Sequence, residues 1–257
     1  MTEKEKKTLL RIALYAGEII LKNGGETYRS EETINLICKS RNMEHVNSFV
    51  TPTGLFISDD RLDGISFIKR VTNRTINLDK ISKVNNFSRK FVAGEINQDD
   101  AIKILDEINE EKKYPNITKM VFTGFAAAFF SLLYGADIID FIVSFIVGMM
   151  GILINWKIEG VSKTNFIANI ISGASIAGLV LIAKRLNIVS NIDMIIVGAI
   201  MPLVPGLALT NGLRDFISGD LVAGVTRVAE ALMIAISIAV GVGTILKLSV
   251  YILGGVV

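Results

Sequence analysis

The residues best placed for chemistry follow a run of proline and glycine in an apolar part of the chain. Pro202, Pro205 and Gly206 disturb helical hydrogen bonding within a segment otherwise apolar enough to cross a bilayer. Non-helical backbone at membrane depth occurs where protein or a water-filled cavity satisfies it, and many transporters bind solutes at such breaks. The polar side chains that accompany this break are Thr210, Asn211, Arg214, Asp215, Asp220, Arg227 and Glu230.

This mixture of charges suits a zwitterionic amino acid or a dicarboxylate as substrate. Arg214 would hold a carboxylate, while Asp215 or Glu230 would hold an ammonium group or a coupling proton. Two plainer interpretations stay open. In one, the break is a kink and its charges are solvated; in the other, Arg227 and Glu230 form an interfacial ion pair one helical turn apart. The residues from Pro202 to Glu230 are therefore a candidate substrate-binding site.

The sequence offers no pattern for an enzyme, a metal centre or a cofactor site. His45 is the only histidine and has no cysteine or carboxylate at ligand spacing, and Cys38 is the only cysteine. Phosphate-binding loops, nucleophile elbows and HExxH motifs are not found. The chain has 27 Lys and Arg against 25 Asp and Glu, which does not favour a nucleic-acid partner. We predict a chain that is not an enzyme and that has no catalytic residue, metal or cofactor.

The charges and the apolar residues occupy different halves of the chain. Residues 1–115 contain 19 basic and 18 acidic side chains, whereas residues 116–257 contain 8 and 7. The second half holds apolar stretches near the roughly 20 residues that a spanning helix needs. We predict a bundle of about five transmembrane helices over residues 116–257. The predicted spans are Ile117–Ala136, Ile138–Ile154, Phe166–Ala183, Ile192 to about Thr210, and Val228 to about Tyr251.

Three further features of the membrane half can be predicted. A polar loop is expected from Asn155 to Thr164, and Ser190 is expected to cap the fourth span. Small residues four apart favour close helix packing in lipid, where no hydrophobic force drives association. These pairs are Gly124/Ala128, Gly173/Ala177, Ala174/Gly178 and Ala239/Gly243.

Residues 1–115 predict a small soluble α+β domain with the element order ααβββαα. Apolar residues at three- and four-residue steps predict a first amphipathic helix that ends at residues 23–25. Short runs rich in Val, Ile and Phe between residues 46 and 71 predict three strands. Tyr114-Pro115-Asn116 marks the boundary with the membrane domain. The predicted core positions of the first helix are Leu9, Ile12, Ala13, Ala16 and Ile20.

The distribution of basic residues predicts the orientation in the membrane. Lys157, Lys163, Arg214 and Arg227 fall on the same side as the N-terminal domain, so that side is expected to be the cytoplasm. Lys184-Arg185 lies on the other side and argues against this orientation. We predict a multi-pass membrane protein with its N-terminal domain in the cytoplasm.

Several separated motifs resemble the threonine/serine exporter family, specifically its larger members that carry an N-terminal soluble domain. Gly24–Ile34 (GGETYRSEETI) is similar to the opening motif of that family, with Gly25 where alanine is usual. Thr51–Gly54 and Arg74–Lys80 are similar to its soluble-domain motifs, and Pro202–Glu230 to its membrane motif. The resemblance spans nearly the whole chain. Within the soluble motifs it singles out, for docking or gating, Gly25, Glu26, Arg29, Glu32, Thr51, Pro52, Thr53 and Gly54.

The resemblance implies a subunit of a secondary transporter in the plasma membrane of a bacterium. Its implied substrates are small hydrophilic metabolites, first threonine and serine, exported with proton coupling. Some relatives are tied to succinate export, so a dicarboxylate is an alternative substrate. Full-length members carry about ten spans, so the present chain resembles one half of a split exporter whose partner is a small five-span protein. An alternative of a different class is a membrane-anchored sensor or assembly protein.

Overall fold

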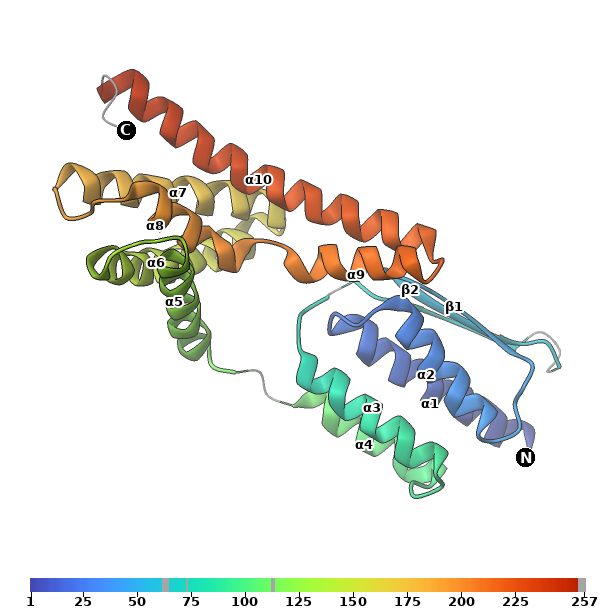
Figure 1. Cartoon of the computed structure of the whole chain (residues 1–257). Coiled ribbons are helices and arrows are strands. Elements are labelled where there is room, and N and C mark those ends of the chain that lie inside the picture. The colour runs from blue at the N-terminus through green and yellow to red at the C-terminus, as the bar shows by residue number, and fades with distance from the viewer. Residues whose placement is uncertain (62–64, 73, 112–113, 254–257) are drawn as a thin grey trace. The chain divides into compact units, whose positions relative to one another are not determined.

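The computed structural model describes residues 1–61, 65–72, 74–111 and 114–253 (Figure 1). Contacts divide the chain into two compact units. Unit 1 consists of Met1–Lys112 and Leu207–Ala229, and unit 2 consists of Lys113–Gly206 and Glu230–Val257. A segment from the apolar half of the sequence therefore packs with the charged half.

Unit 1 is an α+β structure in which helices pack on one face of an antiparallel sheet of order β1-β2-β3. This confirms the predicted α+β region. The elements are α1 (Glu3–Lys22), α2 (Thr27–Lys39), β1 (Val46–Thr51), β2 (Gly54–Asp59), β3 (Ile65–Arg70), α3 (Leu78–Val92) and α4 (Gln98–Glu110). Helix α9 (Gly206–Ile217) and the first turns of α10 (Leu221–Leu253) complete unit 1.

Helix α1 forms the centre of unit 1. It begins with a capping box, in which Glu5 N donates to Thr2 Oγ1 and Thr2 N donates to Glu5 Oε2. All five predicted core positions on its apolar face have no solvent exposure. The helix ends at Lys22 with Asn23 as its C-cap, and Gly24 follows at φ +92°, a conformation that disfavours residues with a Cβ. The predicted end of this helix is therefore confirmed.

The sheet joins the core through one face only. Val50, Leu55 and Ile57 are buried in the same cluster as α1, while Phe49 and Phe56, paired across β1 and β2, are exposed on the other face. The segment Thr51–Gly54 makes the hairpin between these strands: Thr51 Oγ1 donates to Gly54 O. Val71 N donates to Thr53 O, which holds the residue after β3 against the same turn.

Unit 2 is helical. Its elements are α5 (Asn116–Leu133), α6 (Ile138–Ser162), α7 (Asn165–Arg185), α8 (Ile192–Ile200), the 3₁₀ turn η1 (Met201–Leu203) and the remainder of α10. In the described part of the chain, four helices are long and apolar enough to cross a membrane: α5, α6, α7 and α10. A fifth span arises if Ile192–Leu203 and Gly206–Ile217 are counted together, although they are bent by 57°. The prediction of about five spans is thus confirmed as four or five candidate spans, with the bend at the predicted break.

Several boundaries in the membrane half differ from the prediction, among them the end of the fourth span, where α9 continues to Ile217 rather than Thr210. Helix α6 continues to Ser162 through the expected polar loop, because Asn155 Nδ2 donates to Asn169 Oδ1 on α7 at 2.9 Å and is satisfied within the helix pair. The residue that caps α8 is Asn191 rather than Ser190, and its side chain makes no capping hydrogen bond. Helix α10 begins at Leu221 rather than Val228.

Some of the predicted small-residue pairs make close contacts and others do not. A methyl group added at Gly124 would lie 2.7 Å from Met149 Cγ, and one at Gly173 would lie 2.9 Å from Ile238 O. Added methyl groups at Gly178 and Gly243 would meet nothing within 4 Å. Spacing identifies residues that share a helix face, but it does not identify the face that meets another helix.

Candidate functional site

The candidate site of unit 1 is built on the turn between α1 and α2. Gly24 and Gly25 follow α1, and Glu26 is the extended residue at which α2 begins. A methyl group at Gly25 would lie 2.9 Å from Ile20 O and would overlap the Ile20 side chain, so this turn packs directly on α1. The turn thereby presents two backbone carbonyls and two polar side chains in succession.

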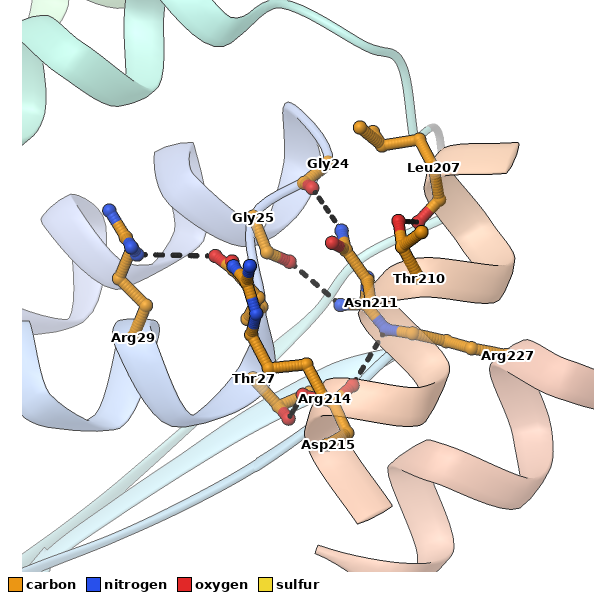
Figure 2. A network of polar contacts seen from close by, with 11 residues as sticks. Gly24, Gly25, Thr27, Arg29, Leu207, Thr210, Asn211, Arg214, Asp215 and Arg227 are labelled. Atoms are coloured by element: carbon orange, nitrogen blue, oxygen red, sulfur yellow. Dashed lines mark hydrogen bonds and ion pairs between the residues drawn. The ribbon is translucent and has the colours of Figure 1, made fainter. Parts of the chain in front are cut away.

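One face of α9 binds three residues of this turn (Figure 2). Asn211 Nδ2 donates to Gly24 O at 2.9 Å, and Thr27 Oγ1 donates to Asp215 Oδ1 at 2.8 Å. Arg214 donates to the Glu26 carboxylate and forms an ion pair with it. Positions 211, 214 and 215 lie on one side of a helix because they are three and four residues apart.

The first turns of α10 close the network. Arg227 Nη2 donates to Gly25 O at 2.7 Å, and Arg227 Nε lies 3.1 Å from Asp215 Oδ2 in an ion pair. Glycines let α9 and α10 approach: a methyl group at Gly212 would lie 2.9 Å from Val228 Cγ2. Asp215 is thus held between Thr27 of α2 and Arg227 of α10.

The network has a buried inner part and a more exposed outer part. The side chains of Asp215 and Arg227 are 0% and 6% exposed. Glu26 also forms an ion pair with Arg29, Arg29 Nε lying 3.1 Å from Glu26 Oε2, so two arginines flank this carboxylate. The side chains of Arg29 and Arg214 are 36% and 55% exposed. The two arginines of the outer part face solvent, whereas the inner part is enclosed by protein.

The electrostatics of the outer part keep Glu26 charged. Burial by itself would raise the pKa of Glu26, but its own backbone N–H, Arg29 and Arg214 together leave that pKa below its ordinary value of 4.5. Glu31, one turn further along α2, behaves in the opposite way. Burial raises the pKa of Glu31, Asp220 and Asp215 add to the rise, and the hydrogen bond from Val50 N opposes it.

The other predicted site residues lie apart from this network. Thr210 Oγ1 donates to Leu207 O within its own helix, and Glu32 is exposed on α2. Pro202, Pro205 and Glu230 belong to unit 2, with Gly206 at the end of that stretch. Thr51, Pro52, Thr53 and Gly54 shape the β1–β2 hairpin. Asp220 begins the connection to α10, where its N–H donates to Asp215 O.

A third motif from the sequence also reaches the α1–α2 turn. Thr75 N donates to Lys22 O and Asn77 N donates to Asn23 O, so the segment 74–80 is bound to the end of α1. Segments from three distant parts of the chain therefore meet at residues 22–27. Sequence reasoning named the motifs but missed Asn23 and Gly24 as contact residues, because carbonyl acceptors leave no signature in residue type. It also missed Thr27, whose hydroxyl donates to a residue 188 positions away.

Unit 2 contains a buried carboxylate that sequence reasoning did not include among the site residues. Asp140, near the start of α6, has no solvent exposure. Its two oxygens accept hydrogen bonds from Ser190 N and Asn191 Nδ2, both at 3.1 Å. Asp140 thus fixes the segment that leads into α8. An acidic residue within an apolar helix was the signal available for it.

Among the described residues, no group of three or more His, Cys, Asp and Glu side chains is arranged to hold a metal ion. The chemistry available in unit 1 is ion pairing and hydrogen bonding, suited to holding a charged solute or an adjoining segment.

Comparison with known proteins gives one match. The profile of a protein family described as "Putative threonine/serine exporter" (ThrE) matches residues 11–249. No curated protein and no solved structure matches the chain significantly. The family match covers unit 1 and the spans of unit 2 together.

Proposed function

The chain belongs to the threonine/serine exporter family, and from this premise we propose that it is a subunit of a secondary transporter that exports threonine and serine from the cytoplasm. It is a multi-pass membrane protein of an exporter family. The observation that carries the choice of substrate is the position of the buried Glu26 carboxylate between Arg29 and Arg214, whose side chains are open to solvent.

The outer part of the network suits an amino acid better than a dicarboxylate. An amino acid would bring a carboxylate for Arg214 and an ammonium group for Glu26. If the ion pair of Arg214 and Glu26 opened, each of the two side chains would therefore gain a new partner. A dicarboxylate could bridge Arg29 and Arg214, but it would leave the ionised Glu26 facing another carboxylate. That like-charge contact is unfavourable, so a dicarboxylate such as succinate is the second candidate.

The inner part serves as the scaffold of this site in our proposal. Asp215 and Arg227 are occupied by each other, Thr27 and Gly25, so they position α9 and leave Arg214 free to exchange partners. Glu230 then takes the role of binding the coupling proton, because it is the acidic residue within the apolar part of α10. Pro202, Pro205, Gly206, Thr210 and Asp220 contribute the break and its polar flank through which solute would pass.

The proposed assembly pairs this chain with a small five-span protein of the same family. Unit 1 would face the cytoplasm, where it would receive the solute. The other class of function, a membrane-anchored sensor or assembly protein, has no use for a bent, proline-containing apolar segment or for an open charge pair.

Metabolite release tests the proposal directly. Bacterial cells would be loaded with a dipeptide containing threonine or serine and would express this chain, this chain with the neighbouring five-span protein, or neither. We expect faster release of threonine or serine only from the pair, and slower release when a protonophore removes the proton gradient. Unchanged release with both proteins present in the membrane would refute the amino-acid assignment.

Substitution of Glu26 separates the two substrate classes. Glu26→Gln removes the partner of an ammonium group and the repulsion against a second carboxylate, so amino-acid export should fall and succinate export should not. Glu32→Gln, on the exposed side of the same helix, is the matched control and should leave both unchanged. If Glu26→Gln and Arg214→Gln both leave transport intact while the subunits still assemble, the chain is an assembly subunit.

A further inference from the structure

The α9–α10 elbow, defined as residues 206–225, carries an apolar surface that the polar network does not use. Leu209, Leu213 and Ile217 on α9 are 40%, 51% and 88% exposed. Leu221, Val222 and Val225 at the start of α10 are 57–63% exposed. A soluble domain rarely keeps this many large apolar side chains in water on two adjoining helices.

These side chains lie opposite the polar contacts. At 3.6 residues per turn, the centre of the Leu209, Leu213 and Ile217 row is about 180° from that of Asn211 and Asp215. On α10 the apolar row lies about 170° from Ala223 and Arg227, which are buried. Each helix of the elbow therefore has one face committed to unit 1 and the opposite face left apolar.

The length of α10 places this apolar surface at the bilayer. Arg227 and Lys247 are twenty positions apart, or about 30 Å along a helix, which equals the thickness of the hydrocarbon core. Glu230 is the one charged residue between them. Leu221 precedes Arg227 by about 9 Å of the same unbroken helix. The first residues of α10 thus fall within the headgroup layer that adjoins the span.

From this we infer that the α9–α10 elbow lies in the headgroup layer: α9 lies along the membrane surface with its apolar face toward the acyl boundary, the first turns of α10 continue the span, and the polar face of the elbow binds the α1–α2 turn. An amphipathic helix binds an interface in this manner, its apolar face 5–10 Å deep. In this arrangement α9 neither completes a fifth span nor re-enters the membrane. The inference does not depend on the identity of the transported solute.

Site-directed spin labelling of the full chain in lipid nanodiscs tests this placement. The native thiol does not interfere, because Cys38 is fully buried and burial raises its pKa to about 12. Single cysteines would be placed at Leu213, Ile217 and Val222, with Lys103→Cys on α4 as the solvent control and Ile236→Cys as the control within the span. Accessibility to oxygen and to a water-soluble nickel chelate reports depth.

We expect elbow labels to favour oxygen over the nickel chelate several-fold more than Lys103→Cys does, at a depth shallower than Ile236→Cys. Equal access of the chelate to the elbow and to Lys103→Cys would place the elbow in water and overturn the inference. Protection from both reagents would show that protein covers the elbow, and it would overturn the inference as well. A depth equal to that of Ile236→Cys would favour a true fifth span instead.

A second measurement introduces charge on α9 and follows the label at Val222. Introducing Leu213→Glu and Ile217→Glu should move a label at Val222 toward the chelate, while Ile68→Glu, an equally exposed apolar residue of β3, should not. An unchanged Val222 label in the charged variant would contradict the placement even if the variant lost stability elsewhere.

Discussion

The helices of unit 1 pack through large apolar side chains, of which Leu9, Ile20 and Phe91 are fully buried. The helices of unit 2 approach one another at glycines instead. A methyl group at Gly148 would overlap Ala127, and one at Gly151 would lie 2.8 Å from Ile176 Cδ1. Unit 2 buries a cluster that includes Ile176 and Ile195, but many of its large apolar residues point outward: Leu133 and Ile138 are 76% and 77% exposed.

The solvent explains this difference. In water, burial of a large apolar side chain contributes about 1.5–3 kcal/mol, so unit 1 gains most by hiding its largest residues. In lipid that gain disappears, and helices associate through close van der Waals contact between small residues. The two units thus obey different packing rules, and the polar network of unit 1 lies where a helix of the apolar half joins the charged half.

The largest expected effect comes from breaking the inner charge pair of unit 1. Asp215→Ala leaves the Arg227 guanidinium buried beside Gly25 without its carboxylate, and loss of one member of a buried pair costs about 3–5 kcal/mol. Hydrogen exchange of the full chain in nanodiscs should show faster exchange in α9 and at the start of α2. Glu32→Ala serves as control and should leave both segments protected. Equal protection in Asp215→Ala would mean that apolar packing alone holds α9.

A second substitution tests the glycine contacts of unit 2. The side chain of Gly241→Val would collide with the backbone of Ile170 and Ala174 on α7, and overpacking of this kind costs about 1–3 kcal/mol. Gly243→Val, two residues along α10, meets open space and should change little. The thermal unfolding temperature in detergent compares the two variants. An equal drop in both would indicate that helix propensity rather than contact is responsible.

A smaller effect is expected at the turn that holds the site. Gly24 has φ +92°, so Gly24→Ala places an ordinary residue in left-handed backbone at a cost of about 1–2 kcal/mol. Gly24→Asn should cost less, because asparagine tolerates this region better. Exchange of the amides in residues 22–27 measures both. If the two variants lose the same protection, steric contact with Thr75 and Leu207 rather than backbone strain is the cause.

The smallest effects concern pH. The pKa of Glu26 is lower in the folded chain than its ordinary value of 4.5. The Glu26 carboxylate therefore contributes to stability above pH 4.5, and this contribution is lost as the pH falls through the folded pKa. The pKa of Glu31 is raised, so its contribution is present below 4.5 and is lost as the pH rises through the folded pKa. When the stability of unit 1 is plotted against pH, Glu26→Gln should reduce the loss of stability below pH 4.5. Glu31→Gln should reduce the loss of stability above pH 4.5. The reverse pattern, measured by hydrogen exchange against pH, would contradict this assignment.

Much of the fold could be predicted because it depends on periodicity within short segments. The buried face of α1, the three strands and the apolar spans each follow from residue spacing. The break in the fourth span was visible in Pro202 and Pro205, since proline cannot continue helical hydrogen bonding.

The partners across the network could not be predicted in the same way. Arg214 and Glu26 are 188 positions apart, and nothing in the local sequence of either specifies the other. The acceptors Gly24 O and Gly25 O belong to the backbone, which every residue has. The grouping of α9 with residues 1–112 was equally hidden, because its leucines resemble those of a membrane span.

Helix α10 belongs to both units without a break in its backbone. No hinge residue or loose linker within it can absorb a movement, since an α-helix is a stiff rod. The residues that contact the α1–α2 turn and the residues of the apolar span therefore share one continuous backbone hydrogen-bond ladder. Arg227 fixes the first turns of this helix to the rest of unit 1 through its contacts with Asp215 and Gly25.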